Sequence, residues 1–434
     1  MELITGNIRS IYKKYLVSSM AGAVVMSIYS FVDTIAVGQA EGPAGAAAMA
    51  VLNPLFGIMV FLGVLCGIGG SVLYGNSRGA GEPEKANALF TAAAVLLGGL
   101  SLILWVVLLL FPHPILLFFG ADEPLLPTVM EYARWLILFL PVFMAPIFLS
   151  SFIRNDGAPT LVMAAVIIGG CVNMLGDWLL VFPFGLGMKG AALATVLGSA
   201  VQLVIMSSHL FSKKCTLRLV RPRRIRPAFR HIVGIGFGAG SLELGTVVLS
   251  IITNNQIMAY GNATHLAVYG VVATIAALLQ ALFGGVGQAI QPIVSANCGA
   301  KQPDRIRKTW KMALATVLIM GVVLTAVCMF FPRAIITLFV DVTPELLAAA
   351  PTVFYAYFPV LLFMGITVLS TYHLQSTLHG GMSLVISLLR SVVISGVLLY
   401  LLPLVLDLIG VWLALPVSEC IVAVIALFYI KKHC

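Results

Sequence analysis

The stretch GAGEPEK at residues 79–85 returns as GAKQPDR at residues 299–305, a shift of 220 positions. The same shift maps Phe111-Pro112 onto Phe331-Pro332. Each copy of the first stretch lies between two long apolar runs, and its glycine and proline residues are typical of a tight loop between helices. The repeat therefore predicts two copies of one helical unit.

The composition restricts the protein to one broad class. The chain has 434 residues, of which 60% are hydrophobic and only 9% are charged. Its mean hydropathy is +1.07. A soluble domain of this length carries far more charge, so the sequence predicts a polytopic membrane protein. The apolar runs are continuous rather than alternating, which favours helices over a β-barrel.

Twelve apolar runs are long enough to cross a bilayer, with six in each copy of the repeat. They lie near residues 15–40, 46–75, 88–111, 130–153, 160–182, 187–211, 231–260, 265–297, 308–331, 350–373, 381–403 and 408–430. Six is an even number, so both copies enter the membrane from the same side. The duplication is therefore parallel, with a pseudo-two-fold axis along the membrane normal.

These runs predict an all-α membrane protein made of two six-helix bundles. The expected domains are an N-terminal lobe at 1–211, a basic connector at 212–230 and a C-terminal lobe at 231–434. A cavity between two such bundles is the natural place for a substrate.

The net charge of +9 comes from loops on one side of the predicted membrane. Of the 25 lysines and arginines, 21 lie at the chain ends or in alternate loops, including eight between Lys213 and Arg230. By the positive-inside rule, both termini and the connector are expected in the cytoplasm. The basic connector is expected to touch lipid headgroups, and no nucleic-acid partner is expected.

The sequence contains no signature of an enzyme. The seven cysteines show no metal-ligand spacing, and the seven histidines are scattered near the ends of the apolar runs. No phosphate-binding loop or nucleophile motif is present. The glycines at 234, 236, 238 and 240 lie inside an apolar run with no preceding strand, so helix packing explains them better than nucleotide binding.

Acidic residues inside the apolar runs are the strongest functional candidates, because a charge at the bilayer centre costs about 2.5–3.5 kcal/mol or more. Asp33 lies past the middle of the first run, and Asp177 lies in the outer half of the fifth. Asn173 precedes Asp177 by one helical turn, so the two share a face. Thr195 enters the membrane from the same outer side. These oxygens suit a shared proton or a monovalent cation such as Na⁺.

This polar set is present in one copy of the repeat only. The 220-residue shift maps Asn173 onto Val393 and Asp177 onto Val397. A duplicated membrane protein with an asymmetric polar interior is typical of a transporter.

Other polar and aromatic side chains are candidates for a substrate cavity. They are Tyr29, Asn155, Glu243, Gln280, Gln375 and Arg390. Glu243, in the seventh run, suits a cationic substrate or a second proton. Arg390 is the unusual cation of the second half and is expected to pair with a carboxylate or a carbonyl. Glu419 follows Pro416 near the middle of the last run and is a further candidate.

The chain resembles the multidrug and toxic compound extrusion (MATE) family over essentially its whole length. The resemblance rests on the two six-span bundles, the basic connector, the paired Gly-Ala-x-x-Pro loops and the segment Val32-Asp33-Thr34. Asp33, Asn173, Asp177 and Thr195 match the cation site in the amino-terminal lobe of prokaryotic members. Asn155 matches a polar position near that site.

The resemblance implies an antiporter that works without a cofactor. It would export cationic or amphipathic drugs or toxins in exchange for H⁺ or Na⁺, as a monomer in the plasma membrane of a prokaryote. The first span lacks the proline that many members carry, and residues 350–373 lack the acid of one subgroup. The second departure favours a coupling site confined to the first half. A lipid-linked oligosaccharide flippase of the same superfamily is the main alternative function.

Overall fold

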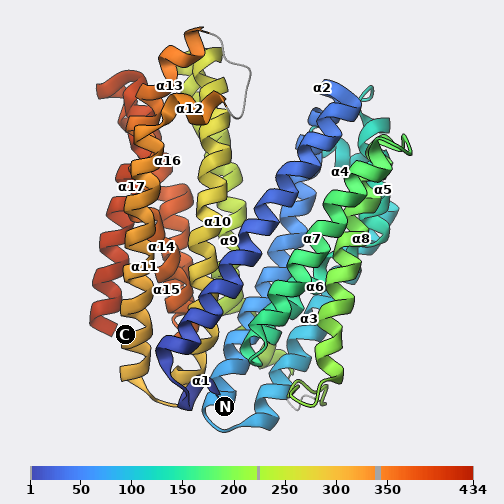
Figure 1. Cartoon of the computed structure of the whole chain (residues 1–434), viewed down its shortest axis with the longest axis vertical. Coiled ribbons are helices and arrows are strands. Elements are labelled where there is room, and N and C mark those ends of the chain that lie inside the picture. The colour runs from blue at the N-terminus through green and yellow to red at the C-terminus, as the bar shows by residue number, and fades with distance from the viewer. Residues whose placement is uncertain (1, 222–224, 338–343, 434) are drawn as a thin grey trace.

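The computed structural model describes residues 2–221, 225–337 and 344–433; within the helices, the side chains of residues 30, 43, 46, 242–244, 247 and 263 are outside this description. The described residues form helices, turns and loops but no strand. Two bundles of helices, one from each half of the sequence, lie side by side (Figure 1). They meet toward the end of the molecule that carries both chain termini, here called the terminal end, and diverge toward the opposite end (Figure 1).

The helices of the first half are α1 (Glu2–Thr5), α2 (Ile8–Gly79), α3 (Pro83–Leu110), α4 (Pro112–Phe118), α5 (Leu126–Leu138), α6 (Leu140–Asn155), α7 (Pro159–Val181), α8 (Gly187–Ser207) and the 3₁₀ helix η1 (Ser208–Phe211). Those of the second half are α9 (Ile225–Tyr260), α10 (Ala263–Gly299), α11 (Pro303–Phe330), α12 (Pro332–Thr337), α13 (Pro344–Tyr357), α14 (Val360–Ser376), α15 (Gly380–Leu388), the π-helical turn η2 (Leu389–Val393), α16 (Ile394–Leu401) and α17 (Pro403–His433).

The predicted twelve-helix, two-bundle fold is confirmed. Among the described residues, nine helices are long and apolar enough to cross a membrane. The pairs α5–α6 and α13–α14 each form one further span, bent by 57° and 45°. Helix α9 corresponds to the seventh predicted run. The first two predicted runs lie in α2 as two helical spans, Ile8–Gly42 and Ala47–Gly79, because the helical geometry breaks at Gly42 with φ 62°.

The duplication is visible in the backbone itself. Helices α3 and α11 begin and end at positions 220 residues apart. In the loops before them, Glu82 N–H donates to Ser77 O and Gln302 N–H donates to Asn297 O, both at 2.9 Å. The third loop residue takes a positive φ in both copies, at Gly81 and at Lys301. Glycine adopts this conformation freely whereas lysine does so at a cost, so the two copies share one loop geometry despite different residues.

The first helix of each half packs partly into the other half at the terminal end. Leu3, Ile11, Tyr12 and Tyr15 are buried in the hydrophobic core of the second half. Reciprocally, Ile232 near the start of α9 is buried in the core of the first half. The Tyr15 hydroxyl donates to the Arg154 carbonyl of α6 at 2.9 Å. The terminal end is therefore where the two halves are joined.

Two glycines allow the halves to approach closely at this end. A Cβ atom at Gly79, the last residue of α2, would lie 1.9 Å from the Ala296 carbonyl oxygen. A Cβ atom at Gly299, the last residue of α10, would lie 1.8 Å from the Asn76 carbonyl oxygen. Because each obstacle is backbone, neither contact tolerates a side chain without moving a helix. The two glycines are repeat mates, so the crossing is symmetric.

Gly79→Ala and Gly299→Ala are each expected to destabilise the joined terminal end. Overpacking of this kind costs about 1–3 kcal/mol, which should appear as a lower melting temperature of the purified protein by fluorescence-detected size exclusion. Gly98→Ala on α3 is the matched control, since a Cβ there meets nothing within 4 Å. Equal melting temperatures for the three variants would contradict the close crossing.

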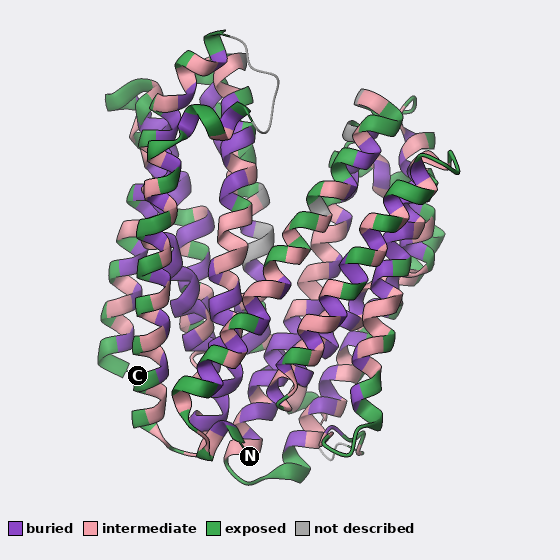
Figure 2. Ribbon diagram, viewed as in Figure 1, coloured by how far each residue is buried: buried purple, intermediate pink, exposed green. Residues whose placement is uncertain are grey.

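The outer faces of the bundles are apolar and exposed, as lipid contact requires. Figure 2 shows buried residues along the inside of each bundle and exposed residues on the outside. On the repeat-related helices α3 and α11, Ile103 and Ile319 are each 64% exposed. A surface of this kind is stable in hydrocarbon rather than in water.

Candidate functional site

A cluster of polar side chains lies inside the first bundle, in the part that is far from the terminal end. Asp33 comes from α2, Tyr132 from α5, Asn173 and Asp177 from α7, and Thr195 from α8. Each of the five has an exposed fraction of 7% or less. The four residues singled out in the sequence are thus brought together, and Tyr132 is added to them.

Thr195 is the centre of the hydrogen bonds in this cluster. Its Oγ1 lies 3.0 Å from the Tyr132 hydroxyl and accepts from Asn173 Nδ2 at 3.4 Å. Helices α7 and α8 come close enough for these contacts because small residues separate them. A Cβ at Gly198 would lie 2.9 Å from the Asn173 Cβ, and one at Gly176 would lie 2.9 Å from the Ala194 Cβ.

Four buried oxygen atoms of the cluster have no hydrogen-bond partner among the described residues. They are Asp33 Oδ1, Asn173 Oδ1 and both carboxylate oxygens of Asp177. Asp33 and Asp177 are also close enough to interact as like charges. Burying such oxygens without a partner costs several kcal/mol in an apolar medium. A proton or a small cation shared by the two carboxylates relieves both the lost hydrogen bonds and the repulsion.

Tyr29 and Asn155 are the two predicted cavity residues of the first half, and they lie far apart in the structure. Tyr29 interacts electrostatically with Asp33, one helical turn away, and packs against Gly170 of α7. Asn155 ends α6 near the terminal end, 23 residues after Tyr132, which is roughly 35 Å along the bent helix pair α5–α6. Its Oδ1 accepts from Ser295 Oγ of the second half at 3.1 Å. The expected position of Asn155 near the cation cluster is therefore wrong.

The candidates of the second half are also dispersed. Gln375, the repeat mate of Asn155, is buried and its Nε2 donates to Ser383 Oγ at 3.0 Å. Gln280 is half-buried on α10. The backbone of Glu243 lies on α9, and its side chain is outside the described residues. Substrate binding by any of them stays a prediction.

Arg390 and Glu419 form a buried ion pair in the second bundle. Arg390 Nε and Nη2 lie 2.8 and 2.5 Å from Glu419 Oε1, and Thr367 Oγ1 donates to Glu419 Oε2 at 2.5 Å. Both charged residues are 5% exposed. Arg390 lies in the π-helical turn η2, and Ser395 Oγ donates to its carbonyl oxygen. The expected pairing of Arg390 is confirmed, and its partner is the glutamate that follows Pro416.

Sequence reasoning missed Tyr132. Its hydroxyl meets Thr195 across 63 residues of sequence, so no local spacing links the two. The only available signal was a tyrosine inside a run near residues 130–153, where a buried hydroxyl requires a polar partner.

A duplicated helical membrane protein with unpartnered carboxylate oxygens buried inside its first bundle has features typical of a membrane transporter. The MatE family model matches residues 19–179 and 243–401, which are most of the chain and fall one in each half. The chain belongs to this family, whose members are transporters and not enzymes.

Proteins of two bacteria are similar to the chain along much of its length. "Multidrug export protein MepA" of Staphylococcus saprophyticus subsp. saprophyticus is 24% identical over 420 residues, covering 96% of this chain and 92% of the relative. "Probable multidrug resistance protein YoeA" of Bacillus subtilis is 25% identical over 333 residues, covering 75% of this chain and 72% of the relative.

Solved structures share the fold. A structure described as "Outward-facing conformation of a multidrug resistance MATE family transporter of the MOP superfamily" has a TM-score of 0.90 at 21% identity, covering 99% of this chain and 97% of the other. Another, "Crystal structure of MATE in the straight conformation", has a TM-score of 0.93 at 20% identity and the same coverage.

Proposed function

We propose that the protein is a secondary active antiporter that exports cationic or amphipathic drugs or toxins in exchange for H⁺ or Na⁺. The observation that carries the proposal is the cluster around Asp33 and Asp177, whose buried carboxylates have unpartnered oxygens; among the described residues, such carboxylates occur in the first half only. The names of the relatives, a multidrug export protein and a probable multidrug resistance protein, support the substrate class.

In the proposed cycle, helix α2 links the binding of the coupling ion to the binding of the substrate. Asp33 lies in the part of α2 that belongs to the first bundle, whereas Tyr12 and Tyr15, at the start of the same helix, are buried in the core of the second. Binding of a proton or Na⁺ at Asp33 and Asp177 neutralises the cluster and changes how α2 packs in the first bundle. That change reaches the second bundle directly, through the same helix.

Export then follows from reciprocal linkage. If the coupling ion lowers the affinity for the drug, the drug lowers the affinity for the ion by the same factor. Ion entry from outside therefore releases the drug outward, and loss of the ion inward resets the protein. Two lobes would move relative to each other in this cycle. They are residues 1–211 and residues 231–434, and the connector 212–230 joins them.

Basic residues support an orientation with the terminal end in the cytoplasm. The cations at positions 213, 214, 218 and 221 of the connector follow η1, and those at 301, 305, 307 and 308 surround the start of α11. Both sets lie at the terminal end, as the positive-inside rule expects for cytoplasmic loops. We place the protein as a monomer in the plasma membrane of a prokaryote, with these cations near anionic lipid headgroups.

The ion pair of Arg390 disfavours the alternative function, a lipid-linked oligosaccharide flippase. A carrier of a lipid-linked pyrophosphate needs cationic groups that are available to the substrate. Arg390, the cation inside the second bundle, is instead neutralised by Glu419 at 2.5 Å, so its charge is not available for a phosphate group.

Transport in inside-out vesicles tests the proposal and separates the two coupling ions. Ethidium uptake into the vesicles should accelerate when either a pH gradient or a Na⁺ gradient is imposed, and the effective gradient identifies the ion. An ionophore that collapses this gradient should remove the acceleration. Uptake that depends on neither gradient would exclude antiport.

A further inference from the structure

A second group of chemically active side chains lies at the terminal end of the first bundle, far from Asp33 and Asp177. Asp156 follows the last residue of α6, His209 belongs to η1, and Cys215 lies in the connector after it. Each residue offers one ligand atom, and these three atoms lie within 4.8 Å of one another. They are a carboxylate oxygen, an imidazole nitrogen and the thiol sulfur. The transport cycle proposed above uses none of the three.

The carboxylate of Asp156 is held in place by hydrogen bonds on both oxygens. Oδ1 accepts from the Tyr74 hydroxyl at 3.0 Å and from the Thr216 hydroxyl. Oδ2 accepts from the Thr216 N–H at 2.9 Å and lies 2.8 Å from His209 Nε2. The side chains of Asp156 and His209 are 1% and 4% exposed. This arrangement fixes the carboxylate and the imidazole relative to each other before any ligand binds.

The thiol of Cys215 is less constrained. Its weak contact with the Leu217 carbonyl oxygen is 3.7 Å long, so the sulfur can turn toward the other two atoms at little cost. Burial raises the pKa of this thiol. Burial alone would also raise the pKa of Asp156, but hydrogen bonds from His209, Thr216 and Tyr74 outweigh it and lower that pKa.

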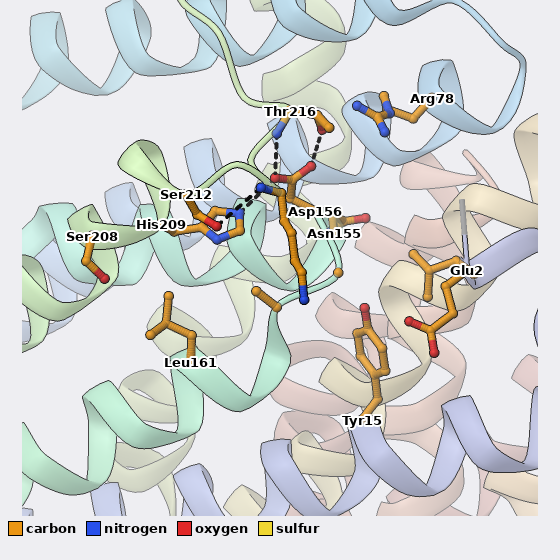
Figure 3. Close-up of a pocket in the computed structure, with 14 residues that line it drawn as sticks. Glu2, Tyr15, Arg78, Asn155, Asp156, Leu161, Ser208, His209, Ser212 and Thr216 are labelled. Carbon is orange, nitrogen blue, oxygen red and sulfur yellow. Dashed lines mark hydrogen bonds and ion pairs between the residues drawn. The ribbon is translucent and has the colours of Figure 1, made fainter.

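A cavity of about 470 Å³ lies against this group and supplies a route for an ion and its water. Figure 3 shows Asp156 held between Thr216 and His209 at the edge of the cavity, with Arg78 beyond the carboxylate. Ser208, Ser212 and Lys214 also line the cavity. The Asp156 carboxylate and the His209 imidazole are thus next to a space with polar side chains in its wall rather than sealed in the bundle.

The three donors match a borderline-soft divalent metal ion. Nitrogen, thiolate and carboxylate ligands are those that Zn²⁺ and Co²⁺ take in four-coordinate sites. Tetrahedral ligation at the usual bond lengths puts ligand atoms roughly 3.3–3.8 Å apart. His209 Nε2 and Asp156 Oδ2 are 2.8 Å apart, and all three ligand atoms lie within 4.8 Å of one another. These distances lie on either side of the tetrahedral range. The bonds of Tyr74 and Thr216 to Asp156 would orient the ligating carboxylate, as outer-shell partners do.

We propose that Asp156, His209 and Cys215 form a binding site for a divalent transition metal ion of the zinc class, with water from the cavity as the fourth ligand. The ion replaces the direct bond between His209 and Asp156. Ligation needs a thiolate and a free lone pair on the imidazole Nε2, so binding releases the thiol proton of Cys215 and leaves the imidazole proton on Nδ1. The metal would fasten the connector to the end of α6.

Titration of the purified full-length chain with Co²⁺ tests this site. The parent protein should carry His433→Ala and Cys434→Ser, because these adjacent residues at the chain end are themselves potential ligands, and it should lack an affinity tag. One equivalent of Co²⁺ is expected to produce a thiolate-to-cobalt absorption band in the near ultraviolet, which Zn²⁺ then removes by displacement.

Cys215→Ser should abolish the band and weaken binding by about 10–100-fold or more, since loss of an outer-shell partner alone costs that much. Cys420→Ser, which changes a half-buried cysteine on α17, should leave both unchanged. His209→Gln should weaken binding in the same way as Cys215→Ser. Size-exclusion profiles show that each variant is folded. A band that persists in folded Cys215→Ser, or a folded parent that binds no Co²⁺ stoichiometrically, would overturn the proposal.

Discussion

Asp33→Asn and Asp177→Asn are each expected to reduce gradient-driven drug export to the level of membranes without the transporter. Asparagine keeps the size and one oxygen of aspartate but neither takes up a proton at neutral pH nor carries a negative charge. In the cluster of the first bundle, the two carboxylates supply three of the four buried oxygens that have no hydrogen-bond partner among the described residues. Removing either charge leaves a site that no longer distinguishes the ion-bound state from the empty state.

The stability of these two variants should not fall, and this separates a coupling role from a structural one. Two close carboxylates in an apolar bundle repel each other, so neutralising one relieves strain rather than creating it. The measurement is ethidium export at matched expression, together with the melting temperature of each purified variant. Wild-type export in both variants would exclude this site as the coupling site.

Asp407→Asn is the matched control, because it makes the same substitution at an aspartate outside the cluster. Asp407 is exposed where helix α17 changes direction, and its backbone has φ 48°. Asparagine accepts this left-handed conformation about as well as aspartate, so both export and stability should remain normal. Loss of export in this control would mean that removing any acid impairs the protein.

The positions of Asp33, Asn173, Asp177 and Thr195 could be predicted from sequence because depth in a membrane follows from counting along a span. A buried acid is conspicuous in an apolar run, and the four-residue spacing of Asn173 and Asp177 sets their common face. The repeat added a comparison within the chain, since it places valines at the corresponding positions 393 and 397.

Contacts between distant segments could not be predicted in this way. Tyr132 joins Thr195 through the packing of α5 against α8, which depends on how each helix is rotated. The burial of Tyr12 and Tyr15 in the second half depends on the path of α2 across the molecule. Hydropathy gives the length of that helix but not the bundle it packs against. The same limitation explains the misplaced Asn155, whose helix was assigned correctly although its position relative to Asp33 was not.

Glu419→Gln and Arg390→Met are each expected to destabilise the second bundle by about 3–5 kcal/mol, because each leaves its partner as an uncompensated buried charge. The pair is almost completely buried, and the single Oε1 atom of Glu419 accepts from two nitrogens of Arg390. Neither remaining charge has water to replace the lost partner. The measurement is the melting temperature of the purified variants in detergent.

The double variant Arg390→Met/Glu419→Leu distinguishes a structural role of the ion pair from a direct role in transport. Replacing a buried ion pair by apolar residues of similar volume is often neutral or stabilising, so the double variant should recover much of the stability that each single variant loses. If the pair only holds α15 and η2 against α17, drug export should recover with stability. A double variant that is as stable as the wild type but inactive would instead assign Arg390 and Glu419 a direct part in transport. Single variants as stable as the wild type would contradict the buried ion pair itself.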